Sequence, residues 1–186
     1  MTLSNEAEFV LRTIEERGIR YVRLWFTDVL GFLKSFTITS QELEGAFAEG
    51  MGFDGSSIDG FSRIQESDMV AIPDPATFQL IPWKTEAEVV RMFCDVLNPD
   101  GTPFEGDPRH VLKRQLARAA DLGYTFYVGP ELEYFYFRGV DEPVFLDQGG
   151  YFDETPLDVA TDWRKRTVAY LESMGIPVEY VHHEVA

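Results

Sequence analysis

Cysteine is almost absent from this sequence of 186 residues, which has Cys94 alone. A chain with one cysteine forms no intramolecular disulfide, and Cys94 lies in an apolar run that is typical of a small buried side chain. No apolar run reaches the roughly 18 residues that a membrane-spanning helix needs. The first residues lack the basic start and apolar core of a signal peptide. We therefore expect a cytoplasmic protein with no membrane partner.

Basic residues are also scarce, since 16 Lys and Arg stand against 32 Asp and Glu and give a formal net charge of −16. This balance argues against nucleic acid and anionic membranes as main partners. It suits a protein that gathers cations, although an acidic surface also serves plain solubility. The hydrophobic content of 45% and aromatic content of 14% predict a packed core. The length suits one domain or two small ones.

The segment GPELEYFYF at 129–137 alternates apolar and other residues between turn signals, which predicts a strand. On a strand Glu131 and Glu133 would share one face, roughly 7 Å apart. Two carboxylates among so much apolar surface are costly unless a cation lies between them. Mg²⁺ and Mn²⁺ prefer carboxylate oxygens. The alternative is a strand whose charged face is simply solvated.

The segment GMGFDGSSIDGFS at 50–62 contains four glycines, which predicts a loop centred on Asp54 and Ser57. Loops of this kind often present polar side chains to a site, and the alternative is an ordinary turn. The segment lacks the lysine and the spacing of a phosphate-binding P-loop.

The remaining pattern of helices and strands predicts an α+β fold. Proline and glycine at both ends of residues 98–107 predict a domain boundary there. From periodicity and capping residues, we expect helices near 4–17, 41–48, 107–122 and 155–174 and further strands near 20–27, 32–39, 69–72, 78–81, 89–97 and 177–181.

The sequence ends in His182, His183 and Glu184, followed by two apolar residues. On an extended strand His182 and Glu184 would share one face and His183 would face the other. Glu184 could then join a cation site, and a solvated strand edge is the alternative. Because the sequence stops inside this predicted strand, we expect a fragment of a longer protein.

Several separated motifs together resemble type I glutamine synthetase. The resemblance covers nearly the whole chain in the right order, and residues 8–35 look most like the actinobacterial branch. The motifs are FDGSS at 53–57, ESDMVAIPDP at 66–75, FCDVLNPDGTPFEGDPRHVLKR at 93–114, GPELEYF at 129–135, GGYF at 149–152 and HHEVA at 182–186.

The resemblance implies a β-grasp domain at residues 1–103 and, at 104–186, the truncated start of a catalytic domain that builds an open-ended α/β barrel. It implies ligation of ammonia to glutamate through a γ-glutamyl phosphate made with ATP. It also implies two or more Mg²⁺ or Mn²⁺ ions in each site and a homo-oligomer of stacked hexameric rings. The isolated fragment is expected to be inactive.

By motif match, Glu133 and Glu184 correspond to ligands of one metal ion, and Glu131 corresponds to a ligand of the second. Glu179, five residues before Glu184, aligns with a residue that contacts ATP.

Asp54 resembles the aspartate of the family's ammonium pocket, which holds the cation and accepts its proton and comes from the neighbouring subunit. Tyr151 and Glu184 resemble the other walls of that pocket, and Ser57 aligns with a serine close by.

Three other functions stay open. A γ-glutamylpolyamine synthetase would replace ammonia with an organic amine, although Asp54 and Tyr151 favour ammonia. In a non-catalytic assembly module the acidic residues would be surface decoration. A two-metal hydrolase would leave the DGSS and GGYF motifs without a role.

Overall fold

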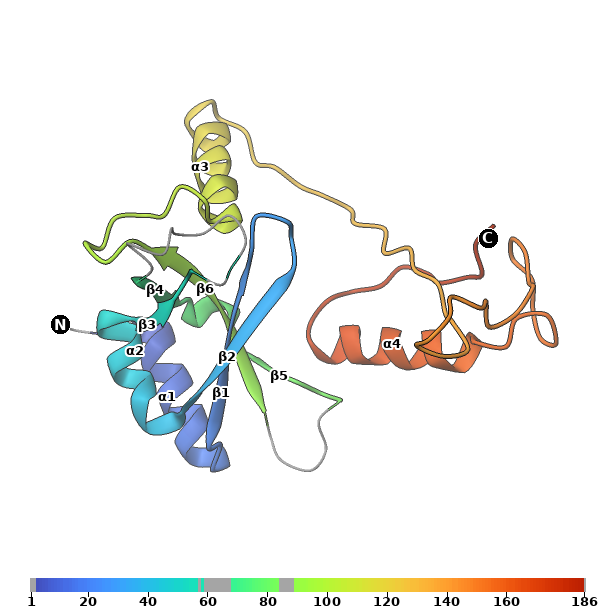
Figure 1. The fold of residues 1–186 in the computed structure, drawn as a ribbon, viewed down its shortest axis with the longest axis horizontal. Helices are drawn as coiled ribbons and strands as arrows, with labels where there is room; N and C mark the ends of the chain where they lie inside the picture. The colour runs from blue at the N-terminus through green and yellow to red at the C-terminus, as the bar shows by residue number, and fades with distance from the viewer. Residues whose placement is uncertain (1–2, 57, 59–67, 84–88, 186) are drawn as a thin grey trace. The chain divides into compact units, whose positions relative to one another are not determined.

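The computed structural model describes residues 3–56, 58, 68–83 and 89–185. The chain divides into two compact units, Met1–Tyr127 and Val128–Ala186. Among the described residues, the first unit contains the strands and helices α1 to α3, and the second contains helix α4 (Figure 1). The predicted site residues are therefore divided between two structural units.

Helix α1 (Asn5–Arg17) begins and ends where the sequence predicts. The Ser4 side chain accepts a hydrogen bond from the Ala7 amide at 3.2 Å, which satisfies one of the unpaired amides at the helix start. Gly18 ends the helix in a left-handed conformation with φ of 63°. The buried side chains of α1 are Ala7, Val10 and Ile14.

The described strands form one sheet in the order β2-β1-β6-β4-β3, and β5 also pairs with β6. β1 runs parallel to β6, and every other pairing is antiparallel. The apolar β6 lies in the middle of the sheet, which confirms its predicted central place. The strands are β1 (Tyr21–Thr27), β2 (Leu33–Thr39), β3 (Met51–Asp54), β4 (Asp68–Pro73), β5 (Gln79–Leu80) and β6 (Val90–Leu97).

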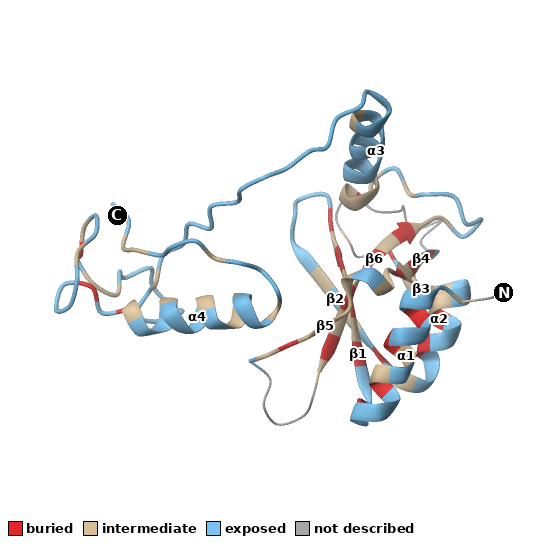
Figure 2. Cartoon of the chain, turned by 180° about the vertical axis from the view of Figure 1, so that it is seen from behind, coloured by how far each residue is buried: buried red, intermediate tan, exposed pale blue. Residues whose placement is uncertain are grey.

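Helices α1 and α2 (Leu43–Glu49) cover one face of the sheet (Figure 2). Burial alternates residue by residue along β6, as it does over most of β1, because successive side chains point to opposite faces. Removing this apolar surface from water is the main stabilising contribution to the first unit. Its fully buried side chains include Val10, Val22, Leu24, Leu43, Val90 and Met92.

Two predictions in the first unit need correction. The second helix, predicted near 41–48, opens with a 3₁₀ turn (Ser40–Glu42), and the α-helix begins only at Leu43. The glycine-rich loop begins later than predicted, because Met51–Asp54 forms β3 and pairs with β4. Met51 and Phe53 pack against the core, and this burial holds the backbone in the sheet.

Helix α3 (Pro108–Asp121) is attached to the sheet through Asp107, which is fully buried. One carboxylate oxygen of Asp107 accepts the Arg109 amide at 3.0 Å and caps the helix, and the other accepts the Val96 amide of β6 at 3.0 Å. The Arg109 guanidinium also pairs with Asp95 of β6 at 2.8 Å. Helix α3 is therefore part of the first unit, although it follows the predicted domain boundary.

Substitution of Asp107 with alanine should lower the free energy of unfolding of the first unit by about 2–3 kcal/mol. The change removes the helix cap and leaves the buried Val96 amide without its acceptor. Urea denaturation of the variant chain would measure the loss. Asp121→Ala, at the exposed end of the same helix, is the control and should change stability by less than about 0.5 kcal/mol. Equal effects of the two changes would contradict the proposed role of Asp107.

In the second unit, helix α4 (Thr161–Ser173) begins later than the start predicted at Thr155. Residues 155–157 form a turn instead, with the Leu157 amide bonded to the Glu154 carbonyl oxygen. Asp158 accepts the Ala160 amide at 3.0 Å, and it also accepts the Thr161 hydroxyl. Asp158 therefore supplies the polar atoms at the start of the helix, in place of the predicted Thr155.

The strand predicted at 129–137 is wrong. Residues 129–136 are in no strand, and the segment makes a single antiparallel bridge between Phe137 and Phe145. The expected alternation of side chains is still present, because the rings of Phe135 and Phe137, two residues apart, lie on the same side and stack with centroids 6.2 Å apart. The pattern thus indicates an extended backbone, but a strand also needs a partner strand, and the described residues supply none. The strand predicted at 177–181 is absent from the described residues for the same reason.

Candidate functional site

Asp54 lies at the end of β3, where the glycine-rich segment leaves the sheet. Its side chain is exposed, and its Oδ1 accepts the Ser56 amide at 2.8 Å. This local hydrogen bond turns the backbone and restricts the orientation of the carboxylate. Ser57, the predicted neighbour of Asp54 in the site, lies outside the described residues.

The closing motif, His182 to Glu184, has alternate side chains on opposite sides of the backbone, as in an extended segment. His182 Nε2 lies 3.7 Å from Glu184 Oε2, whereas His183 points to Asp147 on a different segment. The predicted separation of these side chains onto two sides is thus observed, without a strand. Glu184 keeps about half of its side chain exposed (51%), so it remains accessible to a ligand.

Tyr151 contacts the same segment through rings. Its centroid lies 5.2 Å from that of His182 and 4.3 Å from that of Phe152. The Phe152 amide donates to the His183 carbonyl oxygen at 3.0 Å, and Phe152 adopts a positive φ of 59°. Tyr151 and Glu184, predicted to line one pocket, therefore both contact His182.

A hydrogen bond between the side chains of Asp147 and His183 connects these two segments. His183 Nε2 lies 3.0 Å from Asp147 Oδ1, and the side chains are 13% and 14% exposed. Asp147 also accepts the Val159 amide at 3.0 Å. The Val159 amide and the His183 ring hold the pKa of Asp147 below its usual value. The hydrogen bond to Asp147 likewise raises the pKa of His183 above its usual value.

The predicted metal ligands do not converge. Glu131 and Glu133 are exposed, as is Glu179, the predicted ATP contact. Across the part of the chain that the structure describes, no three His, Cys, Asp or Glu side chains lie close enough to hold a metal ion. The carboxylate oxygens suit a hard cation in their chemistry, but the described residues do not bring three of them together around one ion.

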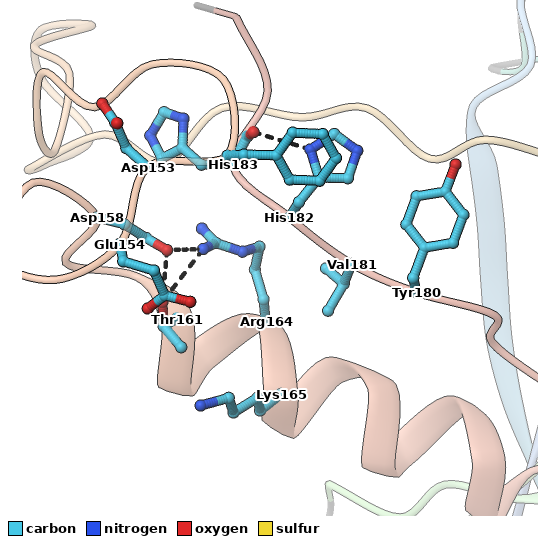
Figure 3. Close-up of a pocket in the computed structure, with 11 residues that line it drawn as sticks. Asp153, Glu154, Asp158, Thr161, Arg164, Lys165, Tyr180, Val181, His182 and His183 are labelled. Carbon is cyan, nitrogen blue, oxygen red and sulfur yellow. Dashed lines mark hydrogen bonds and ion pairs between the residues drawn. The ribbon is translucent and has the colours of Figure 1, made fainter.

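A hollow of about 490 Å³ lies beside the closing motif in the second unit. Figure 3 shows Arg164 of α4 reaching Asp158 and Thr161 on one side of the hollow, with His182 on the other. Asp158 is almost fully buried, and hydrogen bonds from Thr161 and Arg164 outweigh the effect of burial and lower its pKa. The hollow therefore mixes charges of both signs and has no single electrostatic character.

Asp147, Asp158 and Arg164 are not among the residues that the sequence motifs predict for the site. The position of Asp147 two residues before a pair of glycines was the available signal, because such glycines let a side chain approach the backbone closely. Asp158 and Arg164 had no comparable signal.

No helix among residues 3–56, 58, 68–83 and 89–185 is long and apolar enough to cross a membrane.

Comparison with protein families divides the chain in two. Residues 18–99 match the model described as the β-grasp domain of glutamine synthetase, and residues 105–186 match its catalytic domain. These matches define a β-grasp domain joined to the start of a catalytic domain, in agreement with the α+β expectation.

The chain is also similar in sequence to curated proteins named glutamine synthetase. It is 57% identical to that of Mycolicibacterium smegmatis and 56% identical to that of Mycobacterium tuberculosis, in each case over 99% of this chain and 43% of the relative. The protein from Halobacterium salinarum is 48% identical over 99% of this chain and 42% of its own length. The chain belongs to the glutamine synthetase family and spans less than half the length of these relatives.

Solved structures show the same fold. A cryo-electron microscopy structure of Plasmodium falciparum glutamine synthetase aligns with a TM-score of 0.78 at 21% identity, over all of this chain and 43% of that one. A complex of GmaS with ADP aligns with a TM-score of 0.77 at 24% identity, over 95% of this chain and 41% of that one.

Proposed function

We propose that this chain is the N-terminal part of a ligase that joins ammonia to glutamate with ATP and yields glutamine. The observation that carries the proposal is the identity of 56–57% to mycobacterial glutamine synthetases along 99% of the chain. The geometry supports it, since Tyr151 and Glu184, two proposed walls of the ammonium pocket, both contact His182.

The proposed reaction has two steps. The γ-carboxylate of glutamate is a poor electrophile, so ATP first phosphorylates it and supplies a leaving group. Ammonium then binds beside Tyr151 and Glu184 of one subunit and the Asp54 that a neighbouring subunit supplies. The Asp54 carboxylate accepts one proton from ammonium, and the ammonia that results attacks the acyl phosphate carbon. The carbon–oxygen bond to phosphate breaks, and the departing phosphate takes up the second proton that nitrogen loses. The hydrogen bond from the Ser56 amide would keep the carboxylate of Asp54 oriented for this transfer.

Members of the family use ATP and divalent cations and form oligomers. We propose that Glu131, Glu133 and Glu184 contribute to Mg²⁺ or Mn²⁺ sites only when a larger part of the catalytic domain is present, since the described residues do not group them. Glu179 would contact ATP. We also propose that Asp54 and Ser57 serve the site of a neighbouring subunit within a cytoplasmic homo-oligomer of stacked hexameric rings.

The test is glutamine formation by the full-length protein with ATP, glutamate and ammonium, beside a parallel assay with putrescine. We expect product with ammonium, and no product above blank from the 186-residue chain alone. Product with putrescine only would favour a γ-glutamylpolyamine synthetase, and no product with either amine would favour a non-catalytic module. Substantial synthesis by the 186-residue chain would show that the active site needs nothing more.

Asp54→Ala in the full-length protein should raise KM for ammonium by about 10- to 100-fold, which corresponds to one charge-assisted hydrogen bond. KM for ATP should change by less than about twofold, because the proposed contact is to ammonium alone. Asp121→Ala is the control, since Asp121 is an exposed carboxylate of the same unit at the end of α3. Equal kinetics for wild type and Asp54→Ala would refute the role of Asp54.

A further inference from the structure

Two segments of the second unit are joined by one side-chain pair that neither the motifs nor the family comparisons assign. Asp147 opens the segment that carries Tyr151, and His183 immediately precedes Glu184. Their closest oxygen and nitrogen atoms lie 3.0 Å apart, although the residues are separated by 36 positions in the sequence. The pair therefore connects the two groups that we assign to the ammonium pocket.

Both partners are held from more than one direction. Asp147 accepts the Val159 amide through Oδ2 at 3.0 Å and uses Oδ1 for the His183 ring. His183 directs its second ring nitrogen, Nδ1, to the Glu184 carbonyl oxygen at 2.7 Å. Each ring nitrogen thus faces an acceptor, and the ring cannot rotate without breaking two contacts.

Gly149 provides space for this ring. A Cβ atom added at Gly149 would lie 2.9 Å from His183 Nε2 and 3.1 Å from Cδ2, both closer than ordinary contact. Gly149 is buried in the second unit. The backbone at this position therefore fits the imidazole only because the side chain is absent.

A backbone hydrogen bond continues the connection. The Phe152 amide donates to the His183 carbonyl oxygen at 3.0 Å, next to Tyr151. The same carbonyl oxygen lies 2.8 Å from Nδ1 of His182, the ring that contacts Tyr151. A shift of His183 would consequently move both the Tyr151 segment and the ring between Tyr151 and Glu184.

We propose that Asp147 and His183 form a clasp that positions Tyr151 and Glu184 relative to one another. Asp147 and His183 would then be positioning residues for ammonium binding. The clasp consists of the Asp147–His183 side-chain hydrogen bond, the space above Gly149 and the Phe152–His183 backbone hydrogen bond. Its role in ammonium binding rests on the proposed function, whereas its role in holding the two segments does not.

The first experiment uses the 186-residue chain and NMR. Asp147→Ala removes the acceptor, and Gly149→Ala pushes the ring away while it keeps the carboxylate. Both variants should shift the ¹⁵N resonances of the His183 ring, shift the Tyr151 ring protons, and speed amide exchange at Phe152 by about tenfold or more. Asp141→Ala, an exposed carboxylate of the same unit, is the control and should leave all three signals as in wild type.

Amide signals of β1 and β6 show in each sample that the first unit remains folded. The clasp is refuted if the His183 resonances stay unchanged in Asp147→Ala and Gly149→Ala. It is also refuted if those resonances move while Tyr151 and Phe152 do not, because the pair would then exist without positioning anything.

The second experiment measures kinetics of the full-length protein. Asp147→Ala and Gly149→Ala should each raise KM for ammonium by about tenfold with KM for ATP changed less than twofold, a split that general destabilisation would not produce. An unchanged KM for ammonium refutes the role in ammonium binding. Absence of glutamine formation by the wild type refutes the proposed function instead, and the NMR comparison still decides whether the clasp holds the segments.

Discussion

Replacement of Gly50 with alanine is expected to lower the free energy of unfolding of the first unit by about 3–5 kcal/mol. Gly50 follows α2 with φ of 79° and ψ of 179°, a backbone region that is open to glycine and strained for other residues. An added Cβ would also lie 2.4 Å from Val70 Cγ1 and 2.5 Å from Ile72 Cδ1. Strain and overpacking act together, because the backbone cannot relieve one without increasing the other.

Hydrogen exchange of the buried amides in β1 and β6 would measure this loss. Gly45→Ala in α2 is the matched control, since nothing lies within 4 Å of a Cβ at that position. Alanine inside a helix should stabilise the unit by about 0.5–1 kcal/mol. If the Gly50→Ala protein is as stable as wild type, α2 and β4 can shift to make room for the methyl group, and the prediction is wrong. Because Gly50 directly precedes β3, we also expect the variant to displace Asp54.

Substitution of Asp158 with alanine should speed amide exchange in the first turns of α4 by about tenfold or more, because it leaves the guanidinium of Arg164 uncompensated. The side chain of Asp158 is 2% exposed and that of Arg164 is 11% exposed, so water replaces little of the lost interaction. The substitution also removes the acceptor for the Ala160 amide and the Thr161 hydroxyl at the start of α4.

Amide exchange along α4 would measure the effect, with Asp162→Ala, an exposed acidic residue of the same first turn, as the control. Asp158→Ala combined with Arg164→Met removes both charges and should restore a substantial part of the loss. A double variant no more stable than Asp158→Ala would show that the unpaired guanidinium is not the cause.

The same pair gives the second unit a defined response to acid. The pKa of Asp158 is lowered in the folded chain, so its stabilising contribution is complete above the pKa of the unfolded chain, about 4. The contribution is lost as the pH falls through the lowered pKa that Asp158 has in the folded chain. Stability of wild type should therefore fall more steeply in this acid range than that of the double variant.

Local signals in the sequence predicted most of the first unit. Ser4 and Gly18 mark the ends of α1, and the alternation in residues 20–27 and 89–97 indicates β1 and β6. These predictions succeeded because each element meets a partner in the same unit, which turns a local preference into a packed structure.

The second unit was harder to predict because its contacts are polar and distant in sequence. The alternation at 129–137 is real, yet the part of the chain that the structure describes offers it no partner strand. The pairs Asp147–His183 and Asp158–Arg164 join residues of ordinary composition, and no periodic pattern marks them. For the candidate site, the motifs predicted that Tyr151 and Glu184 line one pocket. They indicated neither the contacts of these two residues with His182 nor the hydrogen bond between Asp147 and His183.

The first unit completes its apolar core with residues that precede position 128, whereas Ala160 is the one buried apolar side chain described in the second. Proteins are synthesised from the N-terminus, so the β-grasp sheet can fold while later residues are still within the ribosome. The order of translation thus matches the order in which this chain can bury its own surface.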